Sequence, residues 1–576
     1  MRCMTPGSDR RIFYGDMLAA LALATLLALV WSVRDWHQLA ALRLTDTDDA
    51  MRLQQIRDWL AGQSFFDLSQ HRLAGGMPMH WSRLPDLVPA GLILALTPML
   101  GRHGAELAAV IAWPTMLFAT ALLLAARVTR QLAPDMGSVA VIVMALAYPA
   151  TTVFLPGRID HHNFQIVLLL ATALALVRPA TWRSGSITGI AAVASVAIGL
   201  EMLPLLVAAG VWLAIAWIRA QPGADRRIRG YAVSLAAGLL VAGFGLRSDQ
   251  WGYPACDAFT VTFFRAAIAA AGGAAGIALC ARLTPSPLPR ALIAIGCGGV
   301  ATACAVAAAP QCLSPYGEID PVLAHLWLTR VGEAQPLAAA PLATIIGQAG
   351  LMLAGIGAAA WQWRRTRDDR WSALLLLQVT ALGVTLLQMR GAHLGAPLAV
   401  PALAATIGAA RRRNAHWALA IWPAAAGIVY PLAAQALPDP TQARAGSAPP
   451  VASCTTPEAL AAIAALPPGT IMAPLDPGPY ILAASAHRVI AAPYHRNNAG
   501  NRASYDFFLG SPPAAQAVAR RWHADYVLLC DDSLAELTPA EQPKDAMLTR
   551  LRDRRPPAWL VPIEMRSAGV HIWRVR

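Results

Sequence analysis

Residues 15–32 read GDMLAALALATLLALVWS, and this stretch decides the class of fold. Its single ionisable side chain, Asp16, lies next to one end. An apolar helix of about 20 residues is long enough to cross the hydrocarbon core of a bilayer. A basic start and an apolar centre are also found in signal peptides, but no A-x-A site followed by a mature domain is evident. We therefore predict a retained membrane-spanning helix.

The same pattern continues along the chain. Of the 576 residues, 56% are apolar and 14% are charged, and the mean hydropathy is +0.47. These values exclude a soluble globular protein, a disordered chain and a coiled coil. We predict a mainly α-helical polytopic membrane protein with about thirteen transmembrane helices, at residues 15–32, 105–127, 137–155, 164–178, 185–200, 202–219, 230–246, 258–282, 289–309, 341–363, 371–388, 393–410 and 416–433.

The positive charge indicates how these helices are oriented. The formal net charge of +13 would suggest nucleic-acid binding in a soluble protein, but arginines gather in the cytoplasmic loops of membrane proteins. With the amino terminus in the cytoplasm and residues 86–100 forming an interfacial or re-entrant helix, all cytoplasmic loops are arginine-rich. These loops are Arg127–Asp135, Arg178–Ser184, Arg219–Gly230, Arg282–Arg290, Arg364–Arg370 and Arg411–His416. We therefore predict no nucleic-acid partner.

This topology leaves residues 33–104, 310–340 and 434–576 outside the membrane. We expect a transmembrane domain at 1–433 and a small α/β domain at 434–576, on the periplasmic face of a bacterial inner membrane. The domain begins with a Pro/Ala/Gly-rich linker and then alternates two helical patterns with three strand patterns. The linker is Leu437–Pro450, the helices are Pro457–Ala465 and Pro513–His523, and the strands are Gly469–Ala473, Tyr526–Cys530 and Gly569–Val575.

An acidic motif, Asp46-Thr47-Asp48-Asp49, opens the first outward region. Clustered acids repel one another unless a cation lies between them, and carboxylate oxygens suit Mg²⁺ or Mn²⁺. The alternative is a solvated turn that caps a helix, with Asp48 or Asp49 at its start. Taken alone, the motif favours the cap.

A second polar motif, Gly157-Arg158-Ile159-Asp160-His161-His162-Asn163, fills a short loop between two predicted spans. Several polar groups at a bilayer face are costly to place unless they are used. The histidines could bind zinc, although adjacent histidines point in different directions. The alternative is an interface anchor with a helix cap, and we favour a functional site here.

Glu333 and Arg390 occupy two further outward positions. Glu333 lies in Thr329–Pro336, where a solvated acid is the ordinary interpretation. Arg390 follows a span, where it could bind a phosphate-bearing ligand or extend its charged end to the membrane surface.

In the carboxy-terminal domain, Pro474–Tyr480 contains Asp476, and Pro493–Asn498 contains Tyr494, His495 and Arg496. Both segments could line a cleft or could be ordinary loops.

Four cysteines lie outside the membrane in this topology. Cys256 and Cys312 fall in outward loops, while Cys454 and Cys530 fall in the tail. An oxidising compartment allows disulfides between them, but the sequence leaves their pairing open.

Together these motifs resemble the catalytic subunit of oligosaccharyltransferase and its single-subunit bacterial and archaeal relatives, which are GT-C membrane glycosyltransferases. Asp48 matches the aspartate of the family's first outward loop. Gly157–His162 matches a Gly-x-x-Asp-x-Asp/Glu pattern, with His162 in place of the second acid. Arg330–Pro336 resembles Ser-Val-Ser-Glu-His-Gln-Pro.

The resemblance implies transfer of a glycan from a polyprenyl-(pyro)phosphate donor, metal-assisted and with inversion at the anomeric carbon. It implies that Asp48, Asp160 and Glu333 are catalytic, that Asp48, Asp160 and His162 hold Mg²⁺ or Mn²⁺, and that Arg390 contacts the donor phosphate. Glu333 and Asp476 would contact the acceptor. Secondary candidates are Asp46, Asp49, His161, Tyr494, His495 and Arg496.

One motif departs from the family. Oligosaccharyltransferases carry Trp-Trp-Asp-Tyr-Gly, which reads the Ser/Thr of Asn-x-Ser/Thr, whereas Pro474–Gly478 keeps only the aspartate and the glycine. The alternative is therefore a GT-C monosaccharide transferase that modifies a lipid or a polysaccharide. A transporter or flippase is disfavoured because the predicted span centres hold almost no ionisable group. A non-catalytic scaffold would leave the spacing of the acids unexplained.

Overall fold

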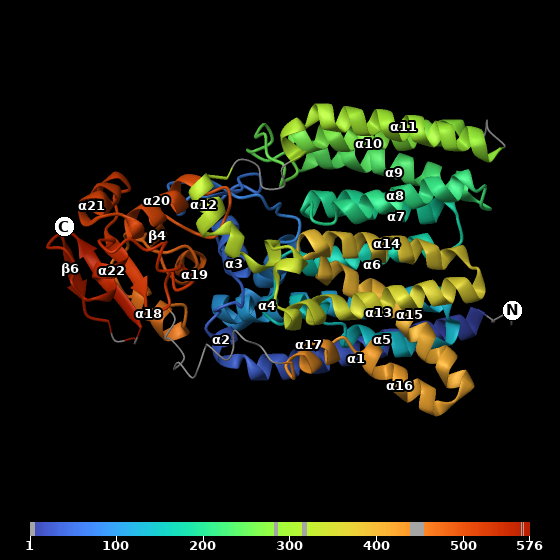
Figure 1. Ribbon diagram of the computed structural model, residues 1–576, viewed down its shortest axis with the longest axis horizontal. Coiled ribbons are helices and arrows are strands. Elements are labelled where there is room, and N and C mark those ends of the chain that lie inside the picture. Colours follow the sequence, from blue (N-terminus) through green and yellow to red (C-terminus); the bar gives the residue numbers. More distant parts are fainter. Residues whose placement is uncertain (1–5, 282–285, 314–318, 438–453, 566, 568) are drawn as a thin grey trace.

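A computed structural model describes residues 6–281, 286–313, 319–437, 454–565, 567 and 569–576. It places a bundle of roughly parallel helices beside a small α/β domain, with the amino terminus at the opposite end of the bundle (Figure 1). The predicted linker after Leu437 and part of the predicted loop Arg282–Arg290 lie outside the described residues.

Long apolar helices confirm a multi-pass membrane protein. Eight helices of the described residues are long and apolar enough to cross a bilayer. They are α1 (Pro6–Arg34), α4 (Leu87–Leu132), α9 (Ala224–Gly245), α10 (Val261–Cys280), α11 (Pro287–Ala308), α13 (Leu342–Thr366), α14 (Asp369–Leu387) and α15 (Gly391–Arg413). Shorter helices accompany them in the bundle: α5 (Gly137–Ala145), α6 (His162–Val177), α7 (Trp182–Ile198) and α8 (Leu203–Ile218).

Two predicted spans are not continuous helices. Residues 137–155 form α5 and then the 3₁₀ helix η2 (Ala150–Phe154). Residues 416–433 divide into α16 (Ala415–Ala425) and α17 (Val429–Ala434). The thirteen predicted segments are thus helical, but two of them break near a proline, which lacks the amide donor that a helix interior needs.

The ambiguous segment 86–100 is helical and runs into the next span. The two join at Gly101, whose φ of 70° and ψ of 168° are not helical. Glycine adopts a positive φ without steric penalty, so it can turn the chain between two helical segments. The segment is therefore a separate arm of α4 rather than part of one straight helix.

The first outward region holds α2 (Trp36–Ala40), α3 (Thr47–Leu60) and the short hairpin β1 (Ser69–Gln70) and β2 (Met77–Pro78). The second holds α12 (Pro321–Leu326) and a series of 3₁₀ turns: η3 (Pro310–Leu313), η4 (Leu328–Arg330), η5 (Gly332–Ala334) and η6 (Leu337–Ala339). The turn η1 (Pro134–Met136) lies between α4 and α5.

The carboxy-terminal domain is α/β, as the alternating pattern predicts. Its five-stranded sheet has the order β4-β3-β5-β7-β6, parallel between β4, β3 and β5 and antiparallel at β7 and β6. Its elements are α18 (Pro457–Ala464), β3 (Thr470–Met472), α19 (Pro477–Ala484), β4 (Arg488–Val489), α20 (Asn498–Leu509), α21 (Pro512–Arg521), β5 (Tyr526–Cys530), α22 (Met547–Arg552), β6 (Leu560–Ile563) and β7 (Val570–Val575).

The outward regions share their core with this domain. Met51 of α3 and Trp81 are buried in one cluster with Ile471 and Tyr480, and Leu323 of α12 is buried in another with domain residues. The first outward region also pairs with the sheet edge, because the Ala74 amide donates to the Val489 carbonyl at 2.9 Å. Burial of shared apolar surface therefore fixes the domain against the end of the bundle that carries the predicted site.

Candidate active site at the outer end of the bundle

The acidic motif both caps a helix and contributes to a cluster. Asp46 is the N-cap of α3, and its side chain accepts from the Asp48 amide at 3.1 Å. The helix thus begins two or three residues earlier than a cap at Asp48 or Asp49 predicts, because Asp46 holds the extended N-cap backbone. Asp48 and Asp49 then lie in the first turn of α3.

Asp49 joins the two polar motifs. One of its carboxylate oxygens accepts the backbone amides of Ile159 and Asp160, both at 2.8 Å. Arg158 pairs with the other oxygen at 3.2 Å and with Asp46 at 2.7 Å. Burial raises the pKa of Asp49 to about 7, although Arg158 acts in the opposite direction. Asp49 therefore sets the position of Asp160.

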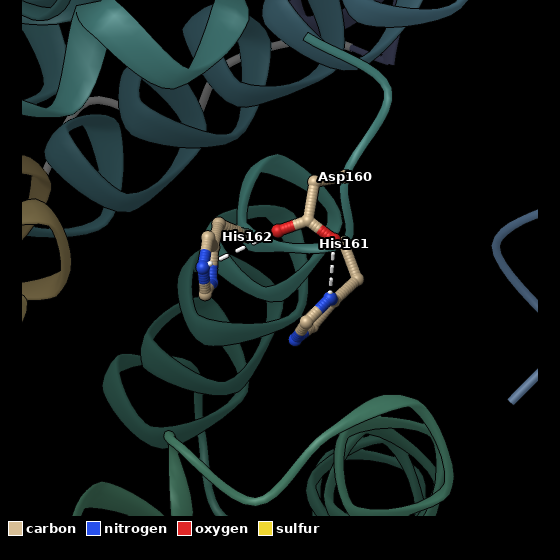
Figure 2. A group of neighbouring side chains, drawn as sticks. All are labelled: Asp160, His161 and His162. Atoms are coloured by element: carbon tan, nitrogen blue, oxygen red, sulfur yellow. Dashed lines mark hydrogen bonds and ion pairs between the residues drawn. The ribbon is translucent and has the colours of Figure 1, made fainter. Parts of the chain in front are cut away.

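Asp160 is buried and held on one side. Its Oδ1 receives Arg52 at 3.2 Å and the His161 Nδ1 at 2.7 Å, while His162 Nε2 lies 3.3 Å from Oδ2 (Figure 2). Oδ2 has no hydrogen-bond partner among the described residues. Burial opposes ionisation, but His161, His162 and Arg52 lower the pKa of Asp160 well below its usual value. The carboxylate is thus charged, and its Oδ2 contacts His162 without a hydrogen bond.

His161 does not face the same way as His162. Its second nitrogen, Nε2, lies 3.1 Å from Glu201, whose other oxygen accepts from Gln165 at 2.8 Å. Burial disfavours the charged ring, but the carboxylates of Asp160 and Glu201 outweigh it and raise the pKa of His161 to about 10. Both nitrogens of His161 are therefore engaged, which leaves His162 as the histidine able to bind a ligand.

Acids far apart in the sequence converge at Asp48. Burial and then the charges of Asp46, Asp160, Glu333 and Asp49 raise the pKa of Asp48 well above its usual value. Such a concentration of negative charge is unfavourable unless a cation joins it. The structure therefore brings Asp48, Asp160 and Glu333 into one electrostatic neighbourhood.

Backbone hydrogen bonds place Glu333 beside Arg390. The Arg390 amide donates to the Glu333 carbonyl at 3.1 Å, and the Met389 amide donates to the Gln335 carbonyl at 2.9 Å. Arg390 precedes α15, and His393 in its first turn lies within electrostatic range of His162 and Arg158. The third and fourth predicted motifs thus meet the first two at the same end of the bundle.

The donor set fits a divalent cation. Among the described residues, Asp160, His161 and His162 form a group whose ligand atoms lie within 4.8 Å of one another. The Asp160 Oδ2 lies 3.3 Å from His162 Nε2, whereas Asp48 lies outside this group of three and within electrostatic range of Asp160. Carboxylates and an imidazole together suit Mn²⁺ and Zn²⁺ as well as Mg²⁺.

A cavity of about 450 Å³ lies between α3 and the α/β domain. Asp46, Thr47 and Asp476 line it. Burial, Glu536 and Asp532 raise the pKa of Asp476. Asp476 therefore lines a cavity that also reaches Asp46 and Thr47, the two residues that precede Asp48.

Of the other domain candidates, Tyr494 lies at the site and His495 and Arg496 do not. The Tyr494 hydroxyl donates to the Thr47 carbonyl at 3.1 Å. His495 and Arg496 instead bind Asp257, at 2.6 and 2.5 Å, in the loop before α10. These two residues connect the domain to a membrane-proximal loop.

The four cysteines predicted to lie outside the membrane form two disulfides, which settles the pairing that the sequence left open. Cys256 is bonded to Cys312 and Cys454 to Cys530. The first joins two loops of the membrane domain next to Asp257, and the second ties the start of the α/β domain to the end of β5.

Sequence reasoning missed the buried partners of Asp160. Arg52 is fully buried and binds Asp86 at 2.7 Å as well as Asp160, and its guanidinium lies 4.9 Å from the Trp81 ring. Glu201 was visible only as an acid between two apolar segments, a rare position that itself signals a role. Nothing in the sequence pairs Arg52 with Asp160, or Glu201 with the neighbouring His161.

Comparison with known proteins places this architecture. No family model and no curated protein matches the chain. The oligosaccharyltransferase of Archaeoglobus fulgidus without ligand aligns over 90% of this chain and 70% of its own, at 15% identity and a TM-score of 0.66. Its complex with an inhibitory peptide and a dolichol-phosphate aligns over 96% and 74%, at 13% identity and 0.63.

Two further structures of that archaeal protein are similar. One, tethered to an acceptor peptide with the NVT sequon, aligns over 96% of this chain and 74% of its own, at 13% identity and a TM-score of 0.64. The other, with Zn and sulfate, aligns over 88% and 68%, at 14% and 0.58. The class defined is that of a multi-pass membrane protein with an α/β domain at one end of its helical bundle. Its fold is that of the oligosaccharyltransferases, which are glycosyltransferases, as the motifs predict.

Proposed function

We propose that this chain is a membrane oligosaccharyltransferase, which moves a glycan from a polyprenyl-(pyro)phosphate-linked donor to a polypeptide acceptor. The observation that carries this proposal is that Asp160 and Glu333 both lie within electrostatic range of Asp48, and that the Glu333 carbonyl accepts from the Arg390 amide at 3.1 Å. The archaeal structures with a dolichol-phosphate and with an acceptor peptide support the two substrate classes.

The proposed topology has thirteen spans, with the site on the periplasmic face of a bacterial inner membrane. Two observations support the orientation. The α/β domain and the amino terminus lie at opposite ends of the bundle (Figure 1). Both disulfides involve residues of outward loops or of that domain, as expected in an oxidising compartment.

Asp48, Asp160 and His162 would hold the divalent cation, Mg²⁺ or Mn²⁺. The archaeal complex with Zn and sulfate supports a cation site in this fold. When bound, such an ion supplies Lewis-acid stabilisation of negative charge on a leaving phosphate. Arg52 and His161 both bind Oδ1 of Asp160, which leaves Oδ2 on the side of His162.

The remaining residues bind and orient the substrates. Arg390 would contact the donor phosphate, since a guanidinium binds phosphate oxygens through paired hydrogen bonds. Glu333 would accept a hydrogen bond from the acceptor amide and align its nitrogen with the anomeric carbon. Direct attack from that side, opposite the leaving phosphate, inverts the configuration. Asp476 would contact the acceptor from the α/β domain.

A second candidate is a GT-C monosaccharide transferase that modifies a lipid or a polysaccharide. The observation in its favour is the segment Pro474–Gly478, which keeps an aspartate but has no tryptophans. Both candidates would use the same donor-side residues. They differ in the acceptor and in the donor, which for the second candidate is a single sugar on a polyprenyl phosphate.

The test is transfer by the purified protein in lipid vesicles. A lipid-linked glycan and an Asn-x-Thr peptide are supplied with and without Mn²⁺, and products are identified by mass spectrometry. We expect a glycopeptide, and no product from Asp48→Ala or Asp160→Ala. Asp545→Asn, an exposed acid of the α/β domain, is the matched control.

Undiminished transfer by both alanine variants would remove the proposed metal site. A modified lipid or polysaccharide without glycopeptide selects the second candidate.

A further inference from the structure

The cavity beside α3 has a different chemistry from a pocket that binds the hydroxyl group of an acceptor Ser or Thr. Its volume of about 450 Å³ is that of a small-ligand site. Most of its wall comes from three segments distant in sequence: the turn before α3, the loop that leads into α19 and the loop after β5. Trp327, Thr455 and Tyr505 complete it from other segments. Residues in this wall include Asp46, Trp327, Asp476, Tyr480, Tyr505, Asp532 and Glu536.

Negative charge dominates the wall. Four carboxylates line the cavity, and Arg43 is the one cationic side chain among its described lining residues. Arg43 donates to Thr455 at 3.0 Å and stacks 4.7 Å from the Tyr480 ring. Asp46 pairs with Arg158 at 2.7 Å. The charges of Asp476, Asp532 and Glu536 are those that face the cavity from the domain side.

Aromatic rings complete the wall. Tyr480, Tyr505 and Trp327 line the same cavity as the carboxylates. Carboxylates with aromatic faces form a favourable surrounding for an ammonium or guanidinium group, through ion pairs and cation–π contacts. The Tyr480 hydroxyl donates to the Thr45 carbonyl at 3.2 Å, which fixes its ring against the turn before α3.

We propose that this cavity binds a lysine or arginine side chain of the polypeptide acceptor, next to the residue that receives the glycan. The proposal rests on the proposed function for the existence of a polypeptide acceptor. Its geometric basis is continuity: Asp46 and Thr47 of the cavity wall immediately precede Asp48. A cation bound between Asp476 and the aromatic rings would hold the neighbouring acceptor residue at the mouth of the site.

The test is binding to the full chain in detergent, measured by fluorescence anisotropy. The probes are labelled Asn-x-Thr peptides in which one flanking position at a time carries lysine or its neutral analogue norleucine. We expect at least one lysine peptide to bind about tenfold more tightly than its norleucine partner. The double variant Asp532→Asn/Glu536→Gln should abolish this preference.

The matched control is Asp545→Asn/Asp553→Asn, which removes two exposed acids of the same domain outside the cavity wall. It should keep the lysine preference. Equal loss in both double variants would mean a general charge effect and would overturn the proposal.

Three other results also overturn it: equal affinity for lysine and norleucine peptides, absence of saturable peptide binding, or tight binding of an uncharged oligosaccharide at the cavity. Failure of the proposed function looks different, because a lysine preference would then persist while no glycan is transferred to the peptide.

Discussion

Two clusters of carboxylate, histidine and arginine lie where the bundle meets the α/β domain. They differ in how many hydrogen bonds the carboxylate oxygens accept. At Asp257, one oxygen receives Arg496 at 2.5 Å, and the other receives His495 at 2.6 Å and Arg496 at 2.8 Å. At Asp160, Oδ1 is held by Arg52 and His161, while Oδ2 has no hydrogen-bond partner among the described residues.

The clusters also differ in their neighbours. Asp257 is surrounded by His80, His495 and Arg496, whereas Asp160 lies within electrostatic range of Asp48, which is itself surrounded by the further acids Asp46, Asp49 and Glu333. A saturated ion-pair cluster joins segments, while a cluster with surplus negative charge and an available oxygen is prepared for a cationic ligand. We therefore interpret the Asp257 cluster as a structural connection and the Asp160 cluster as a candidate binding site, although both consist of the same residue types.

The sharpest test of this difference is Asp48→Asn. We expect glycan transfer to fall by about 10²–10³-fold, because the side chain loses its charge where charge stabilisation is needed. The thermal unfolding midpoint should stay the same or rise, since a repelled acid is removed. A midpoint that falls together with activity would contradict the assignment of Asp48 to the site.

Asp257→Asn should show the opposite pattern. Removing the charge leaves Arg496 and His495 without their partner, and breaking such a pair destabilises by several kcal/mol when it is buried. We expect the thermal midpoint to fall by about 5 °C and transfer to fall only a few-fold. Differential scanning fluorimetry and the transfer assay measure the two effects in one preparation. Loss of transfer at an unchanged midpoint would place Asp257 in the site instead.

The contribution of the Asp257 cluster to stability should depend on pH. Burial opposes ionisation, but His495 and Arg496 hold the pKa of Asp257 well below its usual value of about 3.9. A lowered folded-state pKa gives stability that is complete above the unfolded value and is lost as the pH falls through the folded one. The difference in midpoint between the unmodified protein and Asp257→Asn should therefore be constant from pH 7 to 5 and shrink below pH 4. A difference that shrinks above pH 5 contradicts this assignment.

The smallest effect is expected at a partly exposed connection. Arg330 of the second outward region pairs with Glu541 at 2.8 Å, and its hydrogen bonds, with those of Thr538, lower the pKa of Glu541 to about 2. Pairs that water reaches contribute little because water screens their charges. Glu541→Gln should shift the midpoint by less than about 1 °C at pH 7. A shift as large as that of Asp257→Asn would contradict this prediction and show that the Arg330–Glu541 pair contributes as much to stability as the Asp257 cluster.

The site could be predicted in part because its residues lie in short polar motifs between apolar segments. The sequence singles out Asp160 and His162 in this way, since polar groups at a bilayer face are costly unless used. It singles out Asp48 and Glu333 only through the resemblance to oligosaccharyltransferases, because each alone is read as a helix cap or a solvated acid. Arg52 and Asp86 were not identifiable, because a charge within an amphipathic outer helix is ordinary in sequence. Arg52 reaches Asp160 across 108 residues of sequence and Asp86 across 34, so both contacts depend on the folded structure.

The sequence by itself determined the membrane class, the approximate positions of the helices and the α/β character of the tail, because hydrophobic length and periodicity are local properties of the chain. Tertiary structure alone decided that the two disulfides form as they do, that Asp49 bridges two motifs, and that His495 and Arg496 serve a connection. Those outcomes depend on which side chains come within about 3 Å of one another, and distances between remote segments are set by packing, not by order along the chain.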